Sequence, residues 1–203
     1  MLNTKSLVAG VTLEVYQSSV LTPVLEQVVN CKDAIAQQYL VECIVQVFPV
    51  EFHVPTLATL LQHTAWLSPA ADVKQLLLVL MERLAAHEPA EDEDAASSPF
   101  CTFQAHIATL CPKEGSADDA EGGAGAIWPV TDVLELYGAL LSFALKVYPG
   151  KLAQFDEVLA AAHVLLAAAP SPPAGATATR VLSSLVSRPL EHFTEVLSVL
   201  QWT

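Results

Sequence analysis

A histidine and a glutamate near the end of the chain have the spacing of a metal-binding pair. His192 and Glu195 stand at i and i+3, so a helix would present both side chains on one face. Carboxylate metal sites in helix bundles use this spacing, but they need a second copy and further carboxylates. No such copy is evident in the sequence, so we interpret the pair as part of a solvated helix face. A small helical metalloenzyme would depend on these two residues alone.

Other patterns for catalysis or cofactor binding are also missing from the sequence. It contains no G-x-S-x-G, no Walker A motif and no H-E-x-x-H. The glycine-rich residues 122–125 follow no predicted strand and lie among acids that would repel a phosphate, which indicates a flexible loop. The acidic residues 91–94 lack the ligand spacing of an EF-hand. We therefore predict a protein that is not an enzyme, with no catalytic residue, no metal ligand and no cofactor.

The remaining reactive or anchoring side chains are scattered. No two of the four cysteines form a C-x-x-C pair, which favours reduced, mostly buried thiols in the cytosol. These cysteines are Cys31, Cys43, Cys101 and Cys111. The other histidines are His53, His63, His87, His106 and His163. Trp66 and Trp128 lie near predicted loop edges, where an indole could either anchor a protein partner or make core contacts. The sequence leaves the partner-binding residues unidentified.

Composition and charge exclude several classes of protein. The chain has 203 residues, of which 53% are hydrophobic, and a formal net charge of −13. It is too apolar for a disordered chain, and nine basic residues against 22 acids argue against binding nucleic acid or anionic lipid. Nine of the acids and only one base lie between His87 and Pro129. The acidity therefore belongs to two predicted loops, and the case against nucleic acid depends on the absence of a basic stripe along the helices.

Apolar periodicity predicts helix after helix and no strand. The clearest stripe places apolar residues at i, i+3, i+4, i+7, i+8 and i+11 from Val73 to Leu84, with Glu82 and Arg83 off the stripe. Asp33 is expected to cap a helix that ends near residue 48. The inner face expected for that helix consists of Ala36, Leu40, Cys43, Ile44, Val47 and Phe48. The predicted helices span residues 12–29 (with a break or kink at Pro23), 34–48, 54–66 (with Pro55 in the first turn), 71–87, 100–110, 130–148, 151–169, 177–187 and 190–202.

Short turns between these helices predict antiparallel hairpins. Pro49, Pro149 and Pro189 each end one apolar helix and begin the next. Residues 47–49 and 147–149 resemble each other, as do 155–159 and 193–197, a faint internal repeat that favours stacked hairpins. We predict an all-α protein, with residues 1–203 as a single α-solenoid segment and with loops at 88–99 and 112–129, both expected to be disordered. A compact helical bundle is the alternative on pattern alone.

Several segments resemble the large helical subunit of retromer, the vacuolar protein sorting-associated protein 35 family. The resemblance is carried by residues 25–34, which read LEQVVNCKDA, by 38–53, which read QYLVECIVQVFPVEFH, and by 144–149, which read ALKVYP. Shorter matches lie at 56–57, 72–74 and 82–85, and the resemblance fades towards Pro189 and 197–200. It covers nearly the whole chain, apart from an apparent expansion of the acidic and glycine-rich loops and a poor match at 100–110.

This resemblance implies an α-solenoid of HEAT-like hairpins that acts as a non-catalytic scaffold in endosome-to-Golgi retrograde transport. The implied partners are arrestin-like and phosphoesterase-fold retromer subunits, cargo receptors and sorting adaptors, without nucleic acid or membrane insertion. The implied location is cytoplasmic and peripheral on endosomal membranes. Another HEAT-like adaptor in trafficking is the alternative.

The family's Pro-Arg-Leu-Tyr-Leu-Arg motif does not occur in this sequence, so no partner-binding residue is carried over. The chain resembles an interior section of the family's N-terminal half. We accordingly expect a fragment or truncated product that exposes apolar surface, including Val196, Leu197, Leu200 and Trp202.

Overall fold

The computed structural model describes residues 12–86, 98–111, 128–169, 179–180 and 182–187. Within these ranges the chain forms helices and no strand, which confirms the predicted all-α class. The chain divides into two compact units. The described part of the first unit is residues 12–86, and the described helices from residue 98 onward belong to the second.

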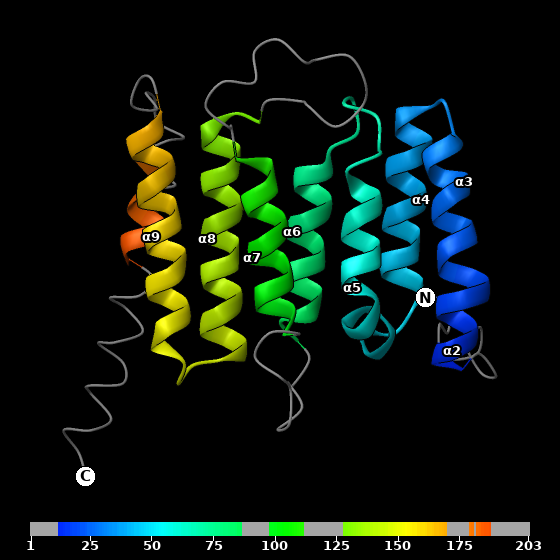
Figure 1. The fold of residues 1–203 in the computed structure, drawn as a ribbon, viewed down its shortest axis with the longest axis horizontal. Helices are drawn as coiled ribbons and strands as arrows, with labels where there is room; N and C mark the ends of the chain where they lie inside the picture. Colours follow the sequence, from blue (N-terminus) through cyan, green and yellow to red (C-terminus); the bar gives the residue numbers. More distant parts are fainter. Residues whose placement is uncertain (1–11, 87–97, 112–127, 170–178, 181, 188–203) are drawn as a thin grey trace. The chain divides into compact units, whose positions relative to one another are not determined.

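Four of the helices of the first unit are arranged as two stacked hairpins (Figure 1). Its helical segments are α2 (Leu13–Val15), η1 (Tyr16–Leu21), α3 (Thr22–Asn30), α4 (Ala34–Val47), α5 (Val50–Thr64) and α6 (Val73–Leu84). Helix α3 packs against α4 and α5, and α6 packs against the same two helices. The first helix of each hairpin therefore lies on the first helix of the next, and the second on the second. This like-on-like stacking is the elementary step of an α-solenoid.

The helix predicted over residues 12–29 is irregular before Pro23 rather than at it. Segments α2, η1 and α3 follow one another without a loop, and η1 is a π-helix. Pro23 has no backbone N–H to donate to the carbonyl four residues earlier, and its ring crowds that carbonyl. The wider π-turn relieves this conflict, and the Thr22 hydroxyl donates to the Gln17 carbonyl at 3.2 Å.

The predicted inner face of α4 is wrong, although its N-cap is correct. The Asp33 carboxylate accepts hydrogen bonds from the backbone N–H groups of Ile35 and Ala36 at 2.9 and 3.0 Å. Of the six residues expected inside, only Ile44 is fully buried, and Leu40 is 41% exposed. The buried residues of the helix are Gln37, Val41, Ile44 and Val45. Because α4 is apolar on nearly every side, periodicity could not select the face that packs.

Helix α5 begins four residues earlier than predicted. Its N-cap is Pro49 and its first residue is Val50, so Pro55 lies inside the helix rather than in its first turn. The first turn of α5 is closed by Phe52, whose N–H donates to the Pro49 carbonyl at 3.0 Å. By contrast, the stripe predicted for α6 is confirmed, because five of its six residues are buried and Val73 is partly exposed.

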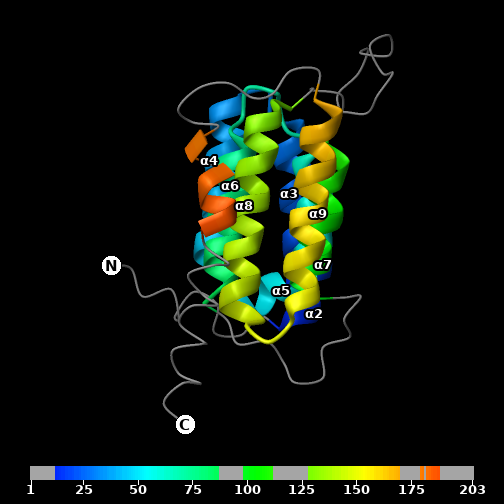
Figure 2. The same cartoon turned by 90° about the vertical axis from the view of Figure 1, so that its left-hand side faces the viewer.

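The second unit is organised around one long helix. Its described helices are α7 (Pro99–Leu110), α8 (Val130–Val147) and α9 (Leu152–Ala168), and residues 179–180 and 182–187 are also helical. Helix α8 packs against both α7 and α9, and α8 and α9 lie side by side in both views (Figures 1 and 2). The Phe103 and Phe143 rings meet edge to face with centroids 5.7 Å apart. Val133, Tyr137, Leu140, Leu141 and Ala144 of α8 are buried, as is its C-cap residue Tyr148.

Several predictions fall on or next to residues outside the described ranges. The loop expected at 88–99 overlaps helix α7, because Ser98 is the N-cap of that helix and Pro99 its first residue. The rest of that loop, residues 112–127 of the second loop and the helix expected at 190–202 lie outside the described residues. The single-segment organisation and the disorder of the loops stay predictions.

Candidate partner-binding surface and the contacts that position it

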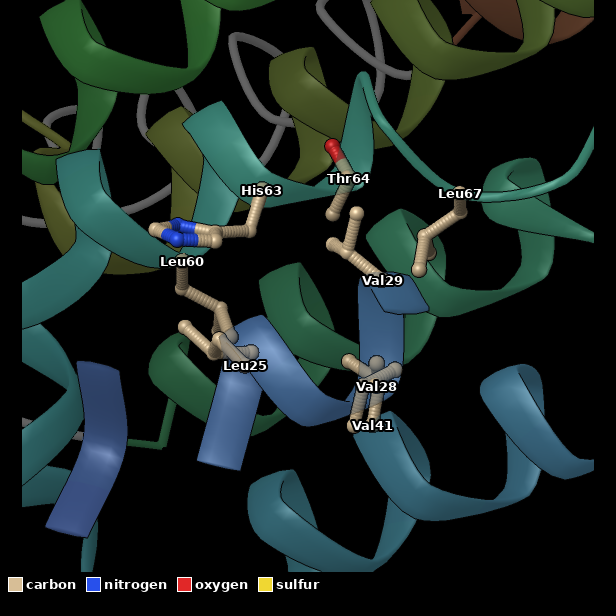
Figure 3. A pocket seen from close by; sticks show the side chains of 8 residues that line it. All are labelled: Leu25, Val28, Val29, Val41, Leu60, His63, Thr64 and Leu67. Atoms are coloured by element: carbon tan, nitrogen blue, oxygen red, sulfur yellow. The ribbon is translucent and has the colours of Figure 1, made fainter. Parts of the chain in front are cut away.

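The described residues contain no group of three or more His, Cys, Asp or Glu side chains that could hold a metal ion, and His192 and Glu195 lie outside them. A small hollow between α3, α4 and α5 is too tight for a water molecule and is lined mainly by aliphatic side chains (Figure 3). Its lining is Leu25, Val28, Val29, Val41, Leu60, His63, Thr64 and Leu67. It is a packing defect in an apolar core.

No described helix has the length and apolar character needed to cross a lipid bilayer. The four cysteines are free and half-buried. The Cys111 thiol lies 3.6 Å from both the Ile107 carbonyl and the Tyr137 hydroxyl. Such contacts are typical of thiols that fill space beside a helix.

The histidines in the described ranges do not gather in one place. His53 is fully buried in α5, while His163 is exposed on α9. His63 hydrogen-bonds the Thr59 carbonyl of its own helix at 2.8 Å through Nδ1. Burial lowers the pKa of His106 in α7. His87 lies outside the described residues.

Exposed apolar side chains form the candidate surface for a protein partner. Ile35, Tyr39 and Leu40 on α4 are 82%, 65% and 41% exposed, and we call them the α4 ridge. Trp66, which follows α5, is 63% exposed, whereas Trp128 is only partly exposed. Large side chains with this exposure are the type that partner proteins bury. A role for Trp66 as an anchor stays a prediction.

Two glutamines connect the N-terminal end of α4 to the next hairpin. Gln37 is only 3% exposed, and its amide donates to the Val29 and Cys31 carbonyls at 3.3 and 2.8 Å. Its side-chain oxygen accepts a hydrogen bond from the Ser68 N–H at 2.7 Å. The neighbouring Gln38 oxygen accepts from the Asp72 N–H at 3.1 Å. Both bonds reach the loop between α5 and α6, so the two hairpins are joined at this end.

Side chains of α5 and α6 satisfy backbone carbonyls at and just beyond the C-terminal end of α4. His53 Nε2 lies 3.1 Å from the Val45 carbonyl, and because a carbonyl can only accept, the proton is on Nε2. Arg83 Nη2 donates to the Gln46 and Phe48 carbonyls at 3.1 and 3.0 Å. A helix leaves its last carbonyls without partners in its own backbone, and a cation is favoured there by the helix dipole.

An aromatic group packs beside this polar contact. The Tyr16 ring is buried against Phe48 and Phe52, with centroid distances of 4.4 and 5.1 Å. Burial raises the pKa of the Tyr16 phenol to about 12, and the nearby Thr56 hydroxyl acts in the opposite direction. Burial also lowers the pKa of His53, which the Val45 carbonyl opposes and the charge of Arg83 reinforces. His53 is therefore neutral at pH 7.

Gln37 and Arg83 were not predicted as positioning residues. Arg83 was expected only to lie off the apolar stripe of its helix, but its guanidinium donates to carbonyls more than 30 residues away along the chain. Gln37 offered one signal, since it is a polar residue in the first turns of a helix that is otherwise apolar on nearly every side. A buried polar residue must find hydrogen-bond partners, so its position can mark a polar contact between elements.

Comparison with known proteins connects this architecture to one family. The profile of the family described as vacuolar protein sorting-associated protein 35 matches residues 2–203. Vacuolar protein sorting-associated protein 35B of Arabidopsis thaliana is 40% identical over 198 residues, which cover 95% of this chain and 23% of that relative. Vacuolar protein sorting-associated protein 35 of Dictyostelium discoideum is 33% identical over 193 residues, which cover 95% of this chain and 24% of the relative. The chain spans about a quarter of the length of these curated relatives.

Proposed function

This chain belongs to the vacuolar protein sorting-associated protein 35 family, and from that membership we propose that it is part of a non-catalytic scaffold subunit of a retromer-type complex. The observation that carries the proposal is the family match, which extends over residues 2–203. The stacked hairpins of the first unit agree with it, because stacked helices present extended surfaces to protein partners.

The proposed process is endosome-to-Golgi retrograde transport of cargo receptors. The curated relatives carry protein sorting in their names, and sorting requires a subunit that holds other proteins together. The proposed partners are an arrestin-like and a phosphoesterase-fold subunit, together with cargo receptors and sorting adaptors. The proposed location is the cytoplasmic side of endosomal membranes, where the protein would be held peripherally by these partners.

The proposal is tested by depleting the protein from cells and following the location of a cargo receptor. We expect the receptor to leave the endosome-to-Golgi route and accumulate in the degradative compartment, and the tagged protein, expressed from its own gene, to restore the route. The same tagged protein should co-purify with the arrestin-like and phosphoesterase-fold subunits. Unchanged receptor traffic together with the absence of both subunits from the purified material would overturn the proposal.

A matched pair of variants makes the test specific for the scaffold surface. Ile35→Ser and Val164→Ser each remove one apolar side chain that is at least 65% exposed, the first on the α4 ridge and the second on α9. Neither change should alter folding, because neither side chain contributes to a core. Loss of receptor recycling with only one of them would locate the working surface on that helix. Wild-type recycling with both would remove these two positions from the scaffold's contact surfaces.

A further inference from the structure

We propose that Arg83 is the positioning residue that sets the angle between hairpin α3/α4 and hairpin α5/α6. The inference rests on the proposed scaffold function only for its biological meaning, since a scaffold acts through its shape. Its structural basis is a set of side-chain-to-backbone hydrogen bonds between the two hairpins. They lie at the two ends of α4 and differ in chemistry.

At the N-terminal end of α4 the connection is neutral, with one partly buried and one exposed bond to the loop of the next hairpin. Gln37 makes three hydrogen bonds at 2.7 to 3.3 Å, and its side chain is almost completely buried. Gln38 adds a bond to the N–H of Asp72, the N-cap residue of α6. Both polar atoms of the Gln37 side chain, the amide nitrogen and the oxygen, make hydrogen bonds. This end is a fixed point between the hairpins.

At the C-terminal end of α4 the connection is charged and incomplete. One nitrogen of Arg83, Nη2, makes both hydrogen bonds to α4 and the turn that follows it. Arg83 Nε and His53 Nδ1 are buried without hydrogen-bond partners among the described residues. The Gln46 bond is exposed to solvent, and the Phe48 bond is partly buried. His53 Nε2 adds a buried contact to the Val45 carbonyl, so Arg83 supplies two of the three side-chain hydrogen bonds described between the hairpins at this end.

The distance between the two ends of α4 determines how the hairpins can move when the hydrogen bonds at one end are lost. Helix α4 has 14 residues, so its ends are about 20 Å apart at a rise of about 1.5 Å per residue. With the glutamine end intact, loss of the Arg83 bonds leaves the His53–Val45 bond and the Tyr16–Phe52 contact at the other end, and we expect the hairpins to rotate slightly about the glutamine end. A small rotation at each junction changes the curvature of a solenoid. Arg83 consequently controls shape at this junction.

The test measures distances between the hairpins at both ends of α4 in the protein at its natural length. Spin labels are introduced as non-natural amino acids, because the four native cysteines are free and would react with thiol reagents. One pair, Gln46 and Glu82, reports on the Arg83 end, and a second pair, Ile35 and Gln75, reports on the glutamine end. All four side chains are exposed. Electron–electron double resonance gives the mean and the width of each distance distribution.

We expect Arg83→Met to lengthen and broaden the Gln46–Glu82 distance while the Ile35–Gln75 distance stays unchanged. Arg83→Lys should give an intermediate result, since lysine keeps the charge but loses the planar fork. Gln37→Leu, which removes the bond to the Ser68 N–H, should produce the reverse pattern. Lys151→Met, which removes a cation from the second unit, should change neither pair. If Arg83→Met leaves both distances unchanged, or broadens both equally, the proposal is overturned. If that variant does not fold, an unchanged Gln46–Glu82 distribution in Arg83→Lys overturns it.

The distance measurement is independent of transport. A shift at the Arg83 end in a protein that recycles no receptor would support the positioning role and contradict the proposed function. Normal receptor recycling, combined with distances between the hairpins that do not change in Arg83→Met, would support the proposed function and contradict the positioning role. Each proposal can thus fail alone.

Discussion

Two turns with nearly the same sequence have different roles in packing. Residues 47–49 read Val-Phe-Pro and residues 147–149 read Val-Tyr-Pro, and each links two long helices. The first turn connects consecutive hairpins, because α4 packs mainly against α3 and α6 rather than against α5. The second connects α8 and α9, which pack directly against each other.

The contacts around the two turns differ in the same way. At the first turn the carbonyls are bound by Arg83 from α6 and His53 from α5, and Tyr16 covers Phe48. At the second, Tyr148 contacts Phe143 of α8, with centroids 6.3 Å apart, and Lys151 at the start of α9 lies 4.8 Å from the Tyr148 ring centroid. Similar turn residues can thus end a helix in either setting, while distant side chains decide which helices pack.

The largest expected effect is at the aromatic group of the first turn. Tyr16→Ala should lower the free energy of unfolding by about 3 to 5 kcal/mol, because it empties a fully buried ring position. Urea unfolding followed by circular dichroism measures this. Tyr16→Phe keeps the ring and is the control, with an expected change below about 1 kcal/mol. Equal losses in the two variants would mean that the hydroxyl, rather than the ring, holds the turn.

Removing the guanidinium should have a smaller effect on stability. Arg83→Met leaves the Gln46 and Phe48 carbonyls without their partner, and we expect a loss of about 2 kcal/mol in the free energy of unfolding. The methionine retains much of the packing of the arginine stem, so the loss reports mainly on the hydrogen bonds. A loss below about 0.5 kcal/mol would show that water replaces the guanidinium at these carbonyls.

The first turn should also make stability depend on pH. The pKa of His53 is lowered in the folded protein, so the unfolded chain binds the proton more tightly. The contribution of neutral His53 to the free energy of unfolding is fully present above the pKa of histidine in the unfolded chain, about 6.5, and decreases as the pH falls below that value. We expect the free energy of unfolding to decrease between pH 7 and pH 5.5, measured by urea unfolding at each pH.

His106 in the second unit has a pKa lowered in the same direction and must be separated from this effect. His53→Gln should reduce the pH dependence and leave the part due to His106. His106→Gln should do the reverse. A pH dependence that persists unchanged in His53→Gln would assign it to the second unit.

The smallest expected effect is at the second turn. Lys151→Met removes the cation above the Tyr148 ring, and an exposed pair of this kind contributes about 0.5 kcal/mol. Differential scanning calorimetry should show a melting temperature lowered by no more than a few degrees. A loss as large as that of Arg83→Met would remove the contrast between the two turns.

The sequence predicted those parts of the fold that depend on local patterns. The α6 stripe, the Asp33 cap and the helical class follow from residues within one or two turns of each other, and the structure confirms them. The packed face of α4 could not be predicted, because apolar residues lie on almost all of its sides: Ile35, Tyr39, Leu40, Val41, Ile44, Val45 and Val47. The burial of Gln37 and the contacts of Arg83 depend on partners about 30 to 40 residues away, and periodicity contains no information at that range.

The candidate partner surface shows the same division. The sequence shows that α4 carries more apolar residues than one buried face requires. It does not show which of them stay exposed, because this depends on how α3 and α6 cover the helix. Function came from the family resemblance, since no motif for chemistry was present to predict it.

The π-helical turn at Tyr16–Leu21 has a consequence for how this helix can change length over evolution. Its buried residues fall at Tyr16, Leu21, Leu25 and Val28, with spacings of five, four and three. The spacing of five puts Tyr16 and Leu21 on one face only because the turn is one residue wider than an α-turn. Deleting a single residue there would shorten this spacing to four, which a regular α-turn also keeps on one face, so Tyr16 would stay on the side of Phe48. Inserting a residue would instead rotate Tyr16 by about 100° away from Phe48, so these six residues should tolerate the loss of one residue but not the gain of another.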